Sequence, residues 1–259
     1  MDLVDLEQHA GRIAALAGDT AMSFFRQAFD VEFKSDQSPV TQADKAVEEQ
    51  VRGYLAEHFP DHGIFGEEQG VSGGDRTQMW VLDPIDGTRS FLSGHPLFGF
   101  LLAHLTGGRA DLGVISMPTL QEIYVGVPKD GVATLNGAEI STSDTTSLTD
   151  AIVYINEGDK IATEQPEVFQ RLLKTGQTRR FGYDCYPHAL LASGHVDLVI
   201  DYDLKPYDFL ALAPVVEAAG GVITGWDNDP LTLDYAGGVV AAATPELHAA
   251  ALALVASKG

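Results

Sequence analysis

The chain has 259 residues, of which 45% are hydrophobic and 20% are charged, as in an ordinary globular protein. Its 37 acidic side chains outnumber its 16 lysines and arginines, and the net charge of −21 argues against a nucleic-acid-binding surface, which has to be basic. A single cysteine, Cys185, excludes an internal disulfide and a zinc site built from cysteines. No segment is apolar over the length of a membrane span, and acids precede any base at the N-terminus, so we expect no signal peptide and a cytoplasmic location.

The first half of the chain is predicted to be α+β. Apolar residues near helical spacing predict a helix over 2–28, and the polar stretch 30–38 predicts an exposed strand or loop. A second helix begins at 40–44, where Thr41 and Asp44 fit a capping box. Residues 70–78 have the composition of a loop. Strands are predicted at 79–82, 96–105, 112–117, 122–127, 131–135 and 139–140, the last two joined by an Asn-Gly turn.

The second half is predicted to be α/β. Residues 141–150 are rich in Ser, Thr and Asp and are the best boundary, so we expect one compact catalytic unit with halves at 1–145 and 146–259. Strands are predicted at 151–155, 178–181, 196–200, 222–224 and 239–243. They alternate with helices at 164–174, 183–193 and 205–219, and a last helix begins with Thr244 as N-cap and Pro245 in its first turn.

The sequence 79–91 is the most informative stretch, and it reads Met-Trp-Val-Leu-Asp-Pro-Ile-Asp-Gly-Thr-Arg-Ser-Phe. It predicts a buried strand followed by a turn, in which Pro84 restricts the backbone so that Asp83 and Asp86 lie near one point. Gly87 and Thr88 follow where a short helix is expected to begin, and helix N-termini bind phosphate. An isolated Asp-Gly would be a simple turn. Two carboxylates beside an anion-binding backbone instead suggest a metal shared between protein and phosphate.

This stretch resembles the signature of the inositol monophosphatase family of metal-dependent phosphatases, and two other stretches resemble further family motifs. The residues Gly66-Glu67-Glu68 are similar to a Gly-Glu-Glu element, although adjacent glutamates are usually solvated. Tyr207-Asp208, followed by an apolar helix and two glycines, is similar to the second signature, with Tyr207 in place of the usual tryptophan. Without the resemblance, Asp208 would be a helix N-terminal acid and Asp44 would be a cap.

The resemblance implies two or three Mg²⁺ ions, a homodimer and the layered α-β-α-β-α sandwich of the inositol monophosphatase/fructose bisphosphatase type. It implies that Glu67, Asp83 and the Ile85 carbonyl hold one ion, and that Asp83, Asp86 and Asp208 hold a second. Asp44 would lie beside a more weakly bound ion. The Gly87 and Thr88 N–H groups would bind phosphate, and Glu67 with the Thr88 hydroxyl would position the attacking water. The partner of the protein would be a small phosphate ester, with no nucleic acid and no membrane.

The expected substrate follows from departures within the family. The stretch 180–186 differs from the inositol enzymes, and Ser90 stands where they usually have asparagine. Gly-Tyr-Asp at 182–184, Arg-Ser-Phe at 89–91 and Lys-Pro-Tyr-Asp at 205–208 are more similar to the histidinol-phosphate phosphatase branch. Acids in this region would bind an ammonium group through charge-assisted hydrogen bonds. The expected substrate contacts are Asp86, Arg89, Gly182, Tyr183, Asp184, Asp201 and Asp208.

Other interpretations stay open at this stage. Inositol monophosphate and a nucleotide 3′-phosphate are alternative substrates, and a non-catalytic regulatory or binding protein of the same fold is an alternative of another class. Cys185 is expected to be a core or pocket-wall residue rather than a nucleophile. No histidines form a His-x-x-His or His-Glu-x-x-His motif, so none is assigned to a metal, and His188 and His195 are expected to flank the 183–194 helix.

Overall fold

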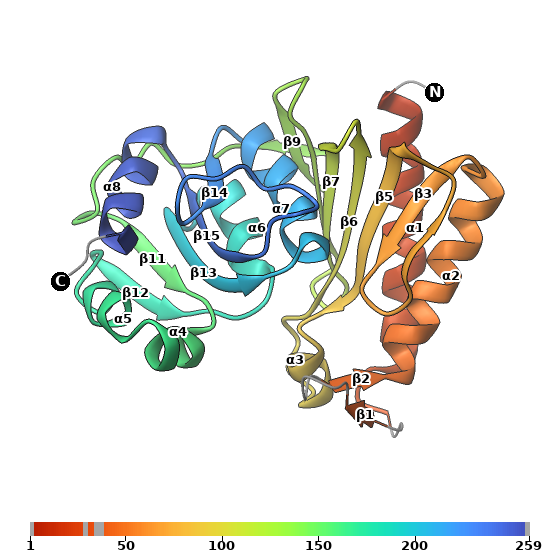
Figure 1. Cartoon of the computed structure of the whole chain (residues 1–259), viewed down its shortest axis with the longest axis horizontal. Coiled ribbons are helices and arrows are strands. Elements are labelled where there is room, and N and C mark those ends of the chain that lie inside the picture. Colours follow the sequence, from red (N-terminus) through yellow and green to blue (C-terminus); the bar gives the residue numbers. More distant parts are fainter. Residues whose placement is uncertain (1–2, 28–30, 34–38, 257–259) are drawn as a thin grey trace.

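The structure of the chain is a computed structural model that describes residues 3–27, 31–33 and 39–256. Two halves lie side by side, each built around one β-sheet (Figure 1). The N-terminal half has an eight-stranded sheet in the order β10-β9-β8-β7-β6-β5-β3-β4. Its strands are β3 (His62–Gly66), β4 (Gly70–Gly73), β5 (Asp75–Asp86), β6 (Gly99–Thr106), β7 (Arg109–Met117), β8 (Glu122–Val127), β9 (Val132–Leu135) and β10 (Ala138–Ile140). A further pair, β1 (Val31–Phe33) and β2 (Pro39–Thr41), forms a two-stranded sheet of its own.

The C-terminal half has a five-stranded mixed sheet in the order β12-β11-β13-β15-β14. Its strands are β11 (Ile152–Ile155), β12 (Thr178–Phe181), β13 (Leu198–Leu204), β14 (Val222–Gly225) and β15 (Gly237–Ala242). β12, β11 and β13 run parallel, whereas β15 is antiparallel to both of its neighbours. The carboxyl ends of three parallel strands therefore meet at one edge of this sheet.

The helices form the other three layers. Helices α1 (Leu3–Phe24) and α2 (Gln42–His58) cover the outer face of the large sheet, and α6 (Tyr186–Ala192) and α7 (Pro206–Ala218) lie between the two sheets (Figure 1). Helices α4 (Gly158–Glu164), α5 (Pro166–Leu172) and α8 (Pro245–Ala256) lie on the far side of the small sheet, and α3 (Thr88–Leu92) is a short turn after β5. The layered α-β-α-β-α arrangement is confirmed.

Alternate side chains of β5 pack into the hydrophobic cores on the two faces of the large sheet. Trp80 and Leu82 pack into the core under α1 and α2, whereas Met79 and Val81 pack into the core that holds α6 and α7. Successive residues of a strand point to opposite faces, so a continuous apolar run is required where both faces are covered. The buried strand predicted from 79–82 is confirmed.

Several predicted elements need correction. Residues 70–78 are not a loop, because β4 pairs with β3 and β5 already begins at Asp75. The predicted helix 164–174 corresponds to α5, which spans only Pro166–Leu172, and the helix before it, α4 at Gly158–Glu164, was not predicted. The predicted helix 183–193 begins only at Tyr186. Of the stretch 30–38, Val31–Phe33 is a strand, and the other positions lie outside the described residues.

The segment between β10 and β11 contains no helix or strand. Its beginning is attached to the second half, because the Thr142 amide donates to the Ala219 carbonyl at 3.0 Å and the Ser143 hydroxyl donates to Asp197. The boundary between 145 and 146 stays a prediction. No helix in the described part of the chain is long and apolar enough to cross a membrane.

Candidate active site

Three aspartates from the two halves converge on one point. Asp83 and Asp86 come from the end of β5, and Asp208 comes from the first turn of α7. One carboxylate oxygen of each lies within 4.8 Å of the others. Asp83 is only 3% exposed, and the other two are partly buried. Because these carboxylates come from both halves, the cluster lies where the halves meet.

An irregularity in β5 places Asp83 and Asp86 together. Residues three apart in a regular strand point to opposite faces of the sheet. The pairing of β5 with β6 shifts between Asp83 and Asp86, and the Ile85 amide donates to the Asp83 carboxylate at 3.0 Å. An extra residue in one strand turns the following side chain toward a different face. The two carboxylates therefore share a site although the strand continues through both.

The carboxylates of this site repel one another. Burial raises the pKa of Asp83 well above its usual range, and the nearby charges of Glu67, Asp86 and Asp208 raise it further. Burial likewise raises the pKa of Asp86, with a contribution from Asp184, and raises the pKa of Asp208 to about 8 against the opposing effect of the Lys205 amide. A divalent cation would relieve this repulsion, and carboxylate oxygens are the donors that Mg²⁺ and Ca²⁺ prefer. The donor set therefore fits a hard divalent cation.

Glu67 reaches the aspartates from the turn after β3. Its amide donates to the Leu82 carbonyl at 3.2 Å, and its side chain forms a hydrogen bond that helps to raise the pKa of Asp83. The fold therefore brings Glu67 to Asp83, and a metal held by both residues stays a prediction. The role of Glu67 toward water stays a prediction.

Sequence reasoning missed Glu48, which holds the turn that carries Glu67. Its fully buried carboxylate accepts hydrogen bonds from the Glu68 amide at 2.8 Å and the Gln69 amide at 3.0 Å, and it pairs with Arg52 at 2.8 Å. A Cβ on Gly66 would lie 2.3 Å from the Glu48 carboxylate, so this approach requires glycine. Residues four apart share a helix face, and the spacing from Asp44 to Glu48 could have indicated this position.

Asp44 and Thr88 connect α2 to the turn before α3. The capping box of Thr41 and Asp44 is confirmed, and it occupies Oδ2 of Asp44. Oδ1 of Asp44 accepts a hydrogen bond from the Thr88 hydroxyl at 3.2 Å, and the Ile85 carbonyl is a second acceptor for that hydroxyl at 3.2 Å. Gly87 precedes α3 with φ 86°, a left-handed conformation that favours glycine.

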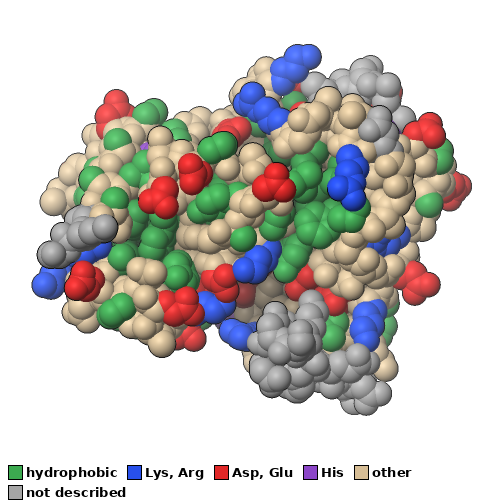
Figure 2. Space-filling view, viewed as in Figure 1, with side chains coloured by type: hydrophobic (Ala, Val, Ile, Leu, Met, Phe, Trp, Pro, Cys, Tyr) green, Lys and Arg blue, Asp and Glu red, His purple; other side chains and the backbone are tan. Residues whose placement is uncertain are grey.

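A cavity of about 200 Å³ extends from Asp86 and Asp208 into the second half. Acidic and basic side chains lie close together where the halves meet (Figure 2). The lining residues are Asp86, Arg89, Glu157, Lys160, Asp184, Cys185, Asp201, Tyr202, Asp203, Leu204, Asp208 and Leu212. The cavity therefore brings together five of the seven predicted substrate contacts, namely Asp86, Arg89, Asp184, Asp201 and Asp208. Sequence reasoning missed Glu157, Lys160 and Asp203.

Asp184 and Asp201 are held by specific donors. The Ser90 hydroxyl donates to Asp184 at 2.6 Å, and the Asn156 amide group donates to Asp201 at 2.7 Å. Burial raises the pKa of Asp184 to about 6 and that of Asp201 to about 7. A Cβ on Gly87 would lie 2.5 Å from the Asp184 carboxyl carbon, so Gly87 also allows the two halves to approach.

Gly182 and Tyr183 are not brought into this acidic cavity. They line a neighbouring cavity of about 390 Å³, which shares Asp184 with the first, and Tyr183 is 55% exposed. Cys185 is buried, as expected, and its amide donates to the Asp86 carboxylate at 2.5 Å. His188 does not flank the helix but lies within α6, fully buried.

Comparison with known proteins agrees with this geometry. Residues 2–259 match the sequence model of the inositol monophosphatase family. The chain belongs to the inositol monophosphatase family. It is 41% identical over 250 residues to the chloroplastic bifunctional phosphatase IMPL2 of Arabidopsis thaliana, covering 93% of this chain and 72% of the relative. It is 37% identical to a histidinol-phosphatase of Chlorobaculum parvum, with 83% of each chain covered.

The solved structures support the same membership. An inositol monophosphatase from Zymomonas mobilis is 38% identical and superposes with a TM-score of 0.87 over 98% of this chain and 99% of its own. As an inositol monophosphatase family member, the chain is a metal-dependent phosphatase that hydrolyses phosphomonoesters. The cluster of Asp83, Asp86 and Asp208 is the group of carboxylates in the described residues that fits this dependence.

Proposed function

We propose that the protein is a Mg²⁺-dependent phosphatase that hydrolyses histidinol phosphate to histidinol and inorganic phosphate, as a step in histidine biosynthesis. The observation that carries the proposal is the contact between Ser90 and Asp184 at the wall of the catalytic cavity. Both residues belong to stretches that depart from the inositol enzymes, and they meet although they are 94 positions apart. The identity to a histidinol-phosphatase adds support.

The chemistry of the cavity suits this substrate. Histidinol phosphate carries an ammonium group and an imidazole besides its phosphate. Asp184 and Asp201 lie in the same cavity as Asp86 and Asp208, and carboxylates bind ammonium groups through charge-assisted hydrogen bonds. The phosphate would lie at the Asp86 and Asp208 end, and the amine would lie toward Asp184 and Asp201.

The catalytic assignment follows the family resemblance. Glu67, Asp83 and the Ile85 carbonyl would hold one Mg²⁺, and Asp83, Asp86 and Asp208 would hold a second. Bound Mg²⁺ supplies charge neutralisation of the phosphate and lowers the pKa of water. Glu67 and the Thr88 hydroxyl would orient the attacking water, and the Gly87 and Thr88 amides would bind phosphate. Asp44 fixes the Thr88 hydroxyl by accepting its hydrogen bond. A homodimer and a cytoplasmic location complete the proposal.

A panel of phosphate esters tests the proposed substrate. With Mg²⁺ present, we expect kcat/KM for histidinol phosphate to exceed that for inositol 1-phosphate and a nucleotide 3′-phosphate by about tenfold or more, which corresponds to about 1.4 kcal/mol. Asp208→Asn is the control that assigns turnover to this site, and we expect it to lose activity by about 100-fold or more.

The other possible results of this experiment each favour a different function. The identity to the Zymomonas mobilis enzyme favours inositol monophosphate as the second candidate. A preference for inositol phosphate would replace histidinol phosphate in the proposal. Full activity of Asp208→Asn would contradict the metal site, and inactivity toward every ester would favour a non-catalytic member of the fold.

A further inference from the structure

The carboxyl ends of the three parallel strands meet at the far wall of the acidic cavity. β11 is followed directly by Asn156 and Glu157, β13 carries Asp201 and Asp203, and Asp184 follows β12. Ligands of α/β sheets bind outside the carboxyl ends of the parallel strands. Four of these five residues line the cavity, so this edge of the small sheet faces the place where a ligand of the enzyme would bind.

Asn156 fixes the position of these strand ends. It is 1% exposed, and its side-chain amide donates both to the Asp184 carbonyl at 3.0 Å and to the Asp201 carboxylate at 2.7 Å. Its backbone amide donates to the Ile200 carbonyl at 2.8 Å. The next residue, Glu157, is therefore attached to a rigid support between Asp184 and Asp201.

Glu157 is partly buried, and its carboxylate has no hydrogen bond or ion pair within the described residues. Its backbone has φ 47°, which is uncommon for a residue with a side chain. Burial raises the pKa of Glu157, with opposing effects of Lys160 and Arg89. Backbone strain of this kind persists when the surroundings enforce it, and here it places an unpaired acid in the cavity.

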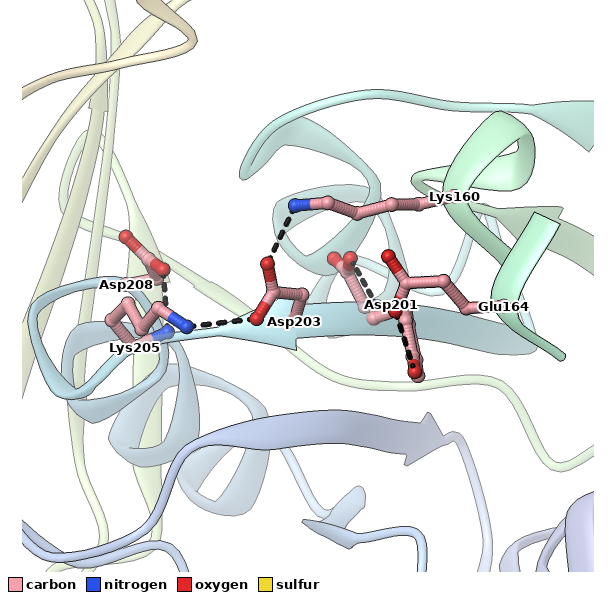
Figure 3. Close-up of polar contacts among 7 residues, drawn as sticks. Lys160, Glu164, Asp201, Asp203, Lys205 and Asp208 are labelled. Atoms are coloured by element: carbon pink, nitrogen blue, oxygen red, sulfur yellow. Dashed lines mark hydrogen bonds and ion pairs between the residues drawn. The ribbon is translucent and has the colours of Figure 1, made fainter. Parts of the chain in front are cut away.

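The charge that remains in this part of the cavity is negative. Asp203 pairs with both Lys160 at 2.5 Å and Lys205 at 2.7 Å, which leaves one surplus positive charge (Figure 3). Apart from Asp86 and Asp208, the three acids Glu157, Asp184 and Asp201 then face this surplus charge and Arg89, so the acids still outnumber the cations by one. The pocket therefore suits a positively charged group.

A buried histidine, His188, lies behind this wall. His188 has no exposed surface, and neither ring nitrogen makes a hydrogen bond within the described part of the chain. Its Nε2 points toward Asp201, 4.0 Å from the carboxylate. Burial lowers the pKa of His188 to about 3, so the ring is neutral and does not offset the acids. Buried polar groups are normally satisfied, so the His188 ring behind Asp201 is an exception in the wall of this cavity.

We propose that Glu157, together with Asp184 and Asp201, binds a protonated amine of the substrate and thereby selects phosphate esters of amino alcohols over those of neutral polyols. This inference rests on the proposed function, because it places the phosphate of the same ester at Asp86 and Asp208. It adds a specificity-determining residue, Glu157, that contacts no catalytic side chain through a hydrogen bond and acts on the part of the ester remote from the phosphate.

The test compares histidinol phosphate with its deamino analogue, which lacks only the amine. Glu157→Gln keeps the size of the side chain and removes its charge. We expect kcat/KM for histidinol phosphate to fall between about 10- and 100-fold, mainly through KM, because a hydrogen bond to a charged group is lost. The deamino analogue should be hydrolysed equally well by both proteins. Glu157→Asp keeps the charge and should retain part of the selectivity.

Asp159→Asn is the matched control, because Asp159 is exposed, lies two residues away and does not line the cavity. It should leave both esters unaffected. An equal loss for both esters in Glu157→Gln, or no loss for histidinol phosphate, would overturn the inference.

The inference can also be separated from the identity of the substrate. If the wild-type protein prefers an ester other than histidinol phosphate, the same variants are tested with 2-aminopropyl phosphate and propyl phosphate. A loss confined to the amino ester would support amine recognition by Glu157 although the proposed function had failed. If the variants showed no loss confined to the amino ester, both the role of Glu157 and the proposed function would be contradicted.

Discussion

Asp44 uses its two carboxylate oxygens for different purposes. Oδ2 accepts a hydrogen bond from the Thr41 amide and caps α2, whereas Oδ1 accepts one from the Thr88 hydroxyl in the turn after β5. Asp208 is similar, because its carboxylate accepts the Lys205 amide at 2.7 Å and also belongs to the cluster of three aspartates. A carboxylate has enough acceptor positions for both tasks. A residue that caps a helix can therefore also belong to a site, and the cap alone does not decide between the two interpretations.

Glu48 provides a prediction at the level of a single side chain. Glu48→Gln keeps the shape but replaces one acceptor oxygen with a donor that faces the Glu68 and Gln69 amides. Residues that orient metal ligands typically change metal affinity or activity by about 10- to 100-fold when mutated. We expect a rise of this size in the Mg²⁺ concentration that gives half-maximal activity, measured from initial rates.

The neighbouring Glu49→Gln is the control for that experiment, because Glu49 is exposed on the same helix. It should leave the Mg²⁺ dependence unchanged. If Glu48→Gln showed a lower thermal stability but an unaltered Mg²⁺ dependence, Glu48 would support the fold without positioning Glu67.

At the scale of elements, strands with strong patterns were predictable and the irregular end of β5 was not. The apolar run 79–82 predicted a strand that stopped at Leu82, but β5 continues to Asp86. Its continuation depends on pairing with β6, and the shift at Asp83–Asp86 arises only when both strands are in place. The edge strand β4 was missed for the same reason, since Gly-Val-Ser-Gly has no alternating pattern of its own.

Some residues of the site were likewise predictable from sequence motifs and others were not. The motifs around Glu67, Asp83 and Asp208 identified residues that the fold brings to one place. Glu157 and Asp203 carry no motif, and both adopt left-handed backbone conformations at the ends of strands. Their closeness follows from the parallel pairing of β11 and β13, which a single sequence does not reveal. Contacts from strand ends were therefore harder to predict than the cluster of Asp83, Asp86 and Asp208.

The packing of α7 on the large sheet depends on glycines in two adjacent strands. A Cβ on Gly126 in β8 would lie 2.4 Å from the Pro214 carbonyl oxygen and the Val215 Cα, and one on Gly113 in β7 would lie 2.3 Å from the Ala211 carbonyl oxygen. These atoms belong to the helix backbone and cannot move without moving α7. Because α7 also carries Asp208, its position links the packing between the halves to the site.

We expect Gly126→Ala to lower the free energy of unfolding by about 1–3 kcal/mol, as is typical of overpacking in a core. Gly53→Ala is a matched control of opposite sign, because Gly53 is exposed in α2 and no atom lies within 4 Å of its added Cβ. It should stabilise the protein by about 0.5–1 kcal/mol through helix propensity. Urea unfolding of both variants measures the two changes. If Gly126→Ala were as stable as Gly53→Ala, α7 would accommodate the added methyl group without a loss of stability.

The whole molecule carries a net charge of −21, and its active site concentrates acids further. At long range this charge repels a phosphate ester, so local metal charge and backbone N–H groups must attract the phosphate. The same concentration of acids makes the metal-free protein sensitive to pH. Binding of a divalent cation and loss of protons from the aspartates are therefore coupled.

Thermal unfolding at two pH values tests this coupling. The pKa values of Asp201 and Asp208 in the folded protein are raised to about 7 and about 8, above the ordinary value of about 3.9 for unfolded aspartate. Between about pH 4 and pH 8 these aspartates bind more protons in the folded state than in the unfolded state. Their contribution to the free energy of unfolding is therefore full below about pH 4 and is lost as the pH rises to about 8. We expect the metal-free protein to lose the remaining part of this contribution between pH 5.5 and pH 8.

Added Mg²⁺ should oppose that loss, because a cation that binds only the folded state adds about 2.7 kcal/mol at a free concentration of about 100 times its Kd. Its stabilising effect should be larger at pH 8 than at pH 5.5, since the ligating carboxylates must be deprotonated. Asp208→Asn removes one of the three clustered carboxylates, so it should reduce both the loss of stability with pH and the gain from Mg²⁺. A gain from Mg²⁺ that was the same at both pH values, or was unchanged in Asp208→Asn, would contradict a cation held by these aspartates.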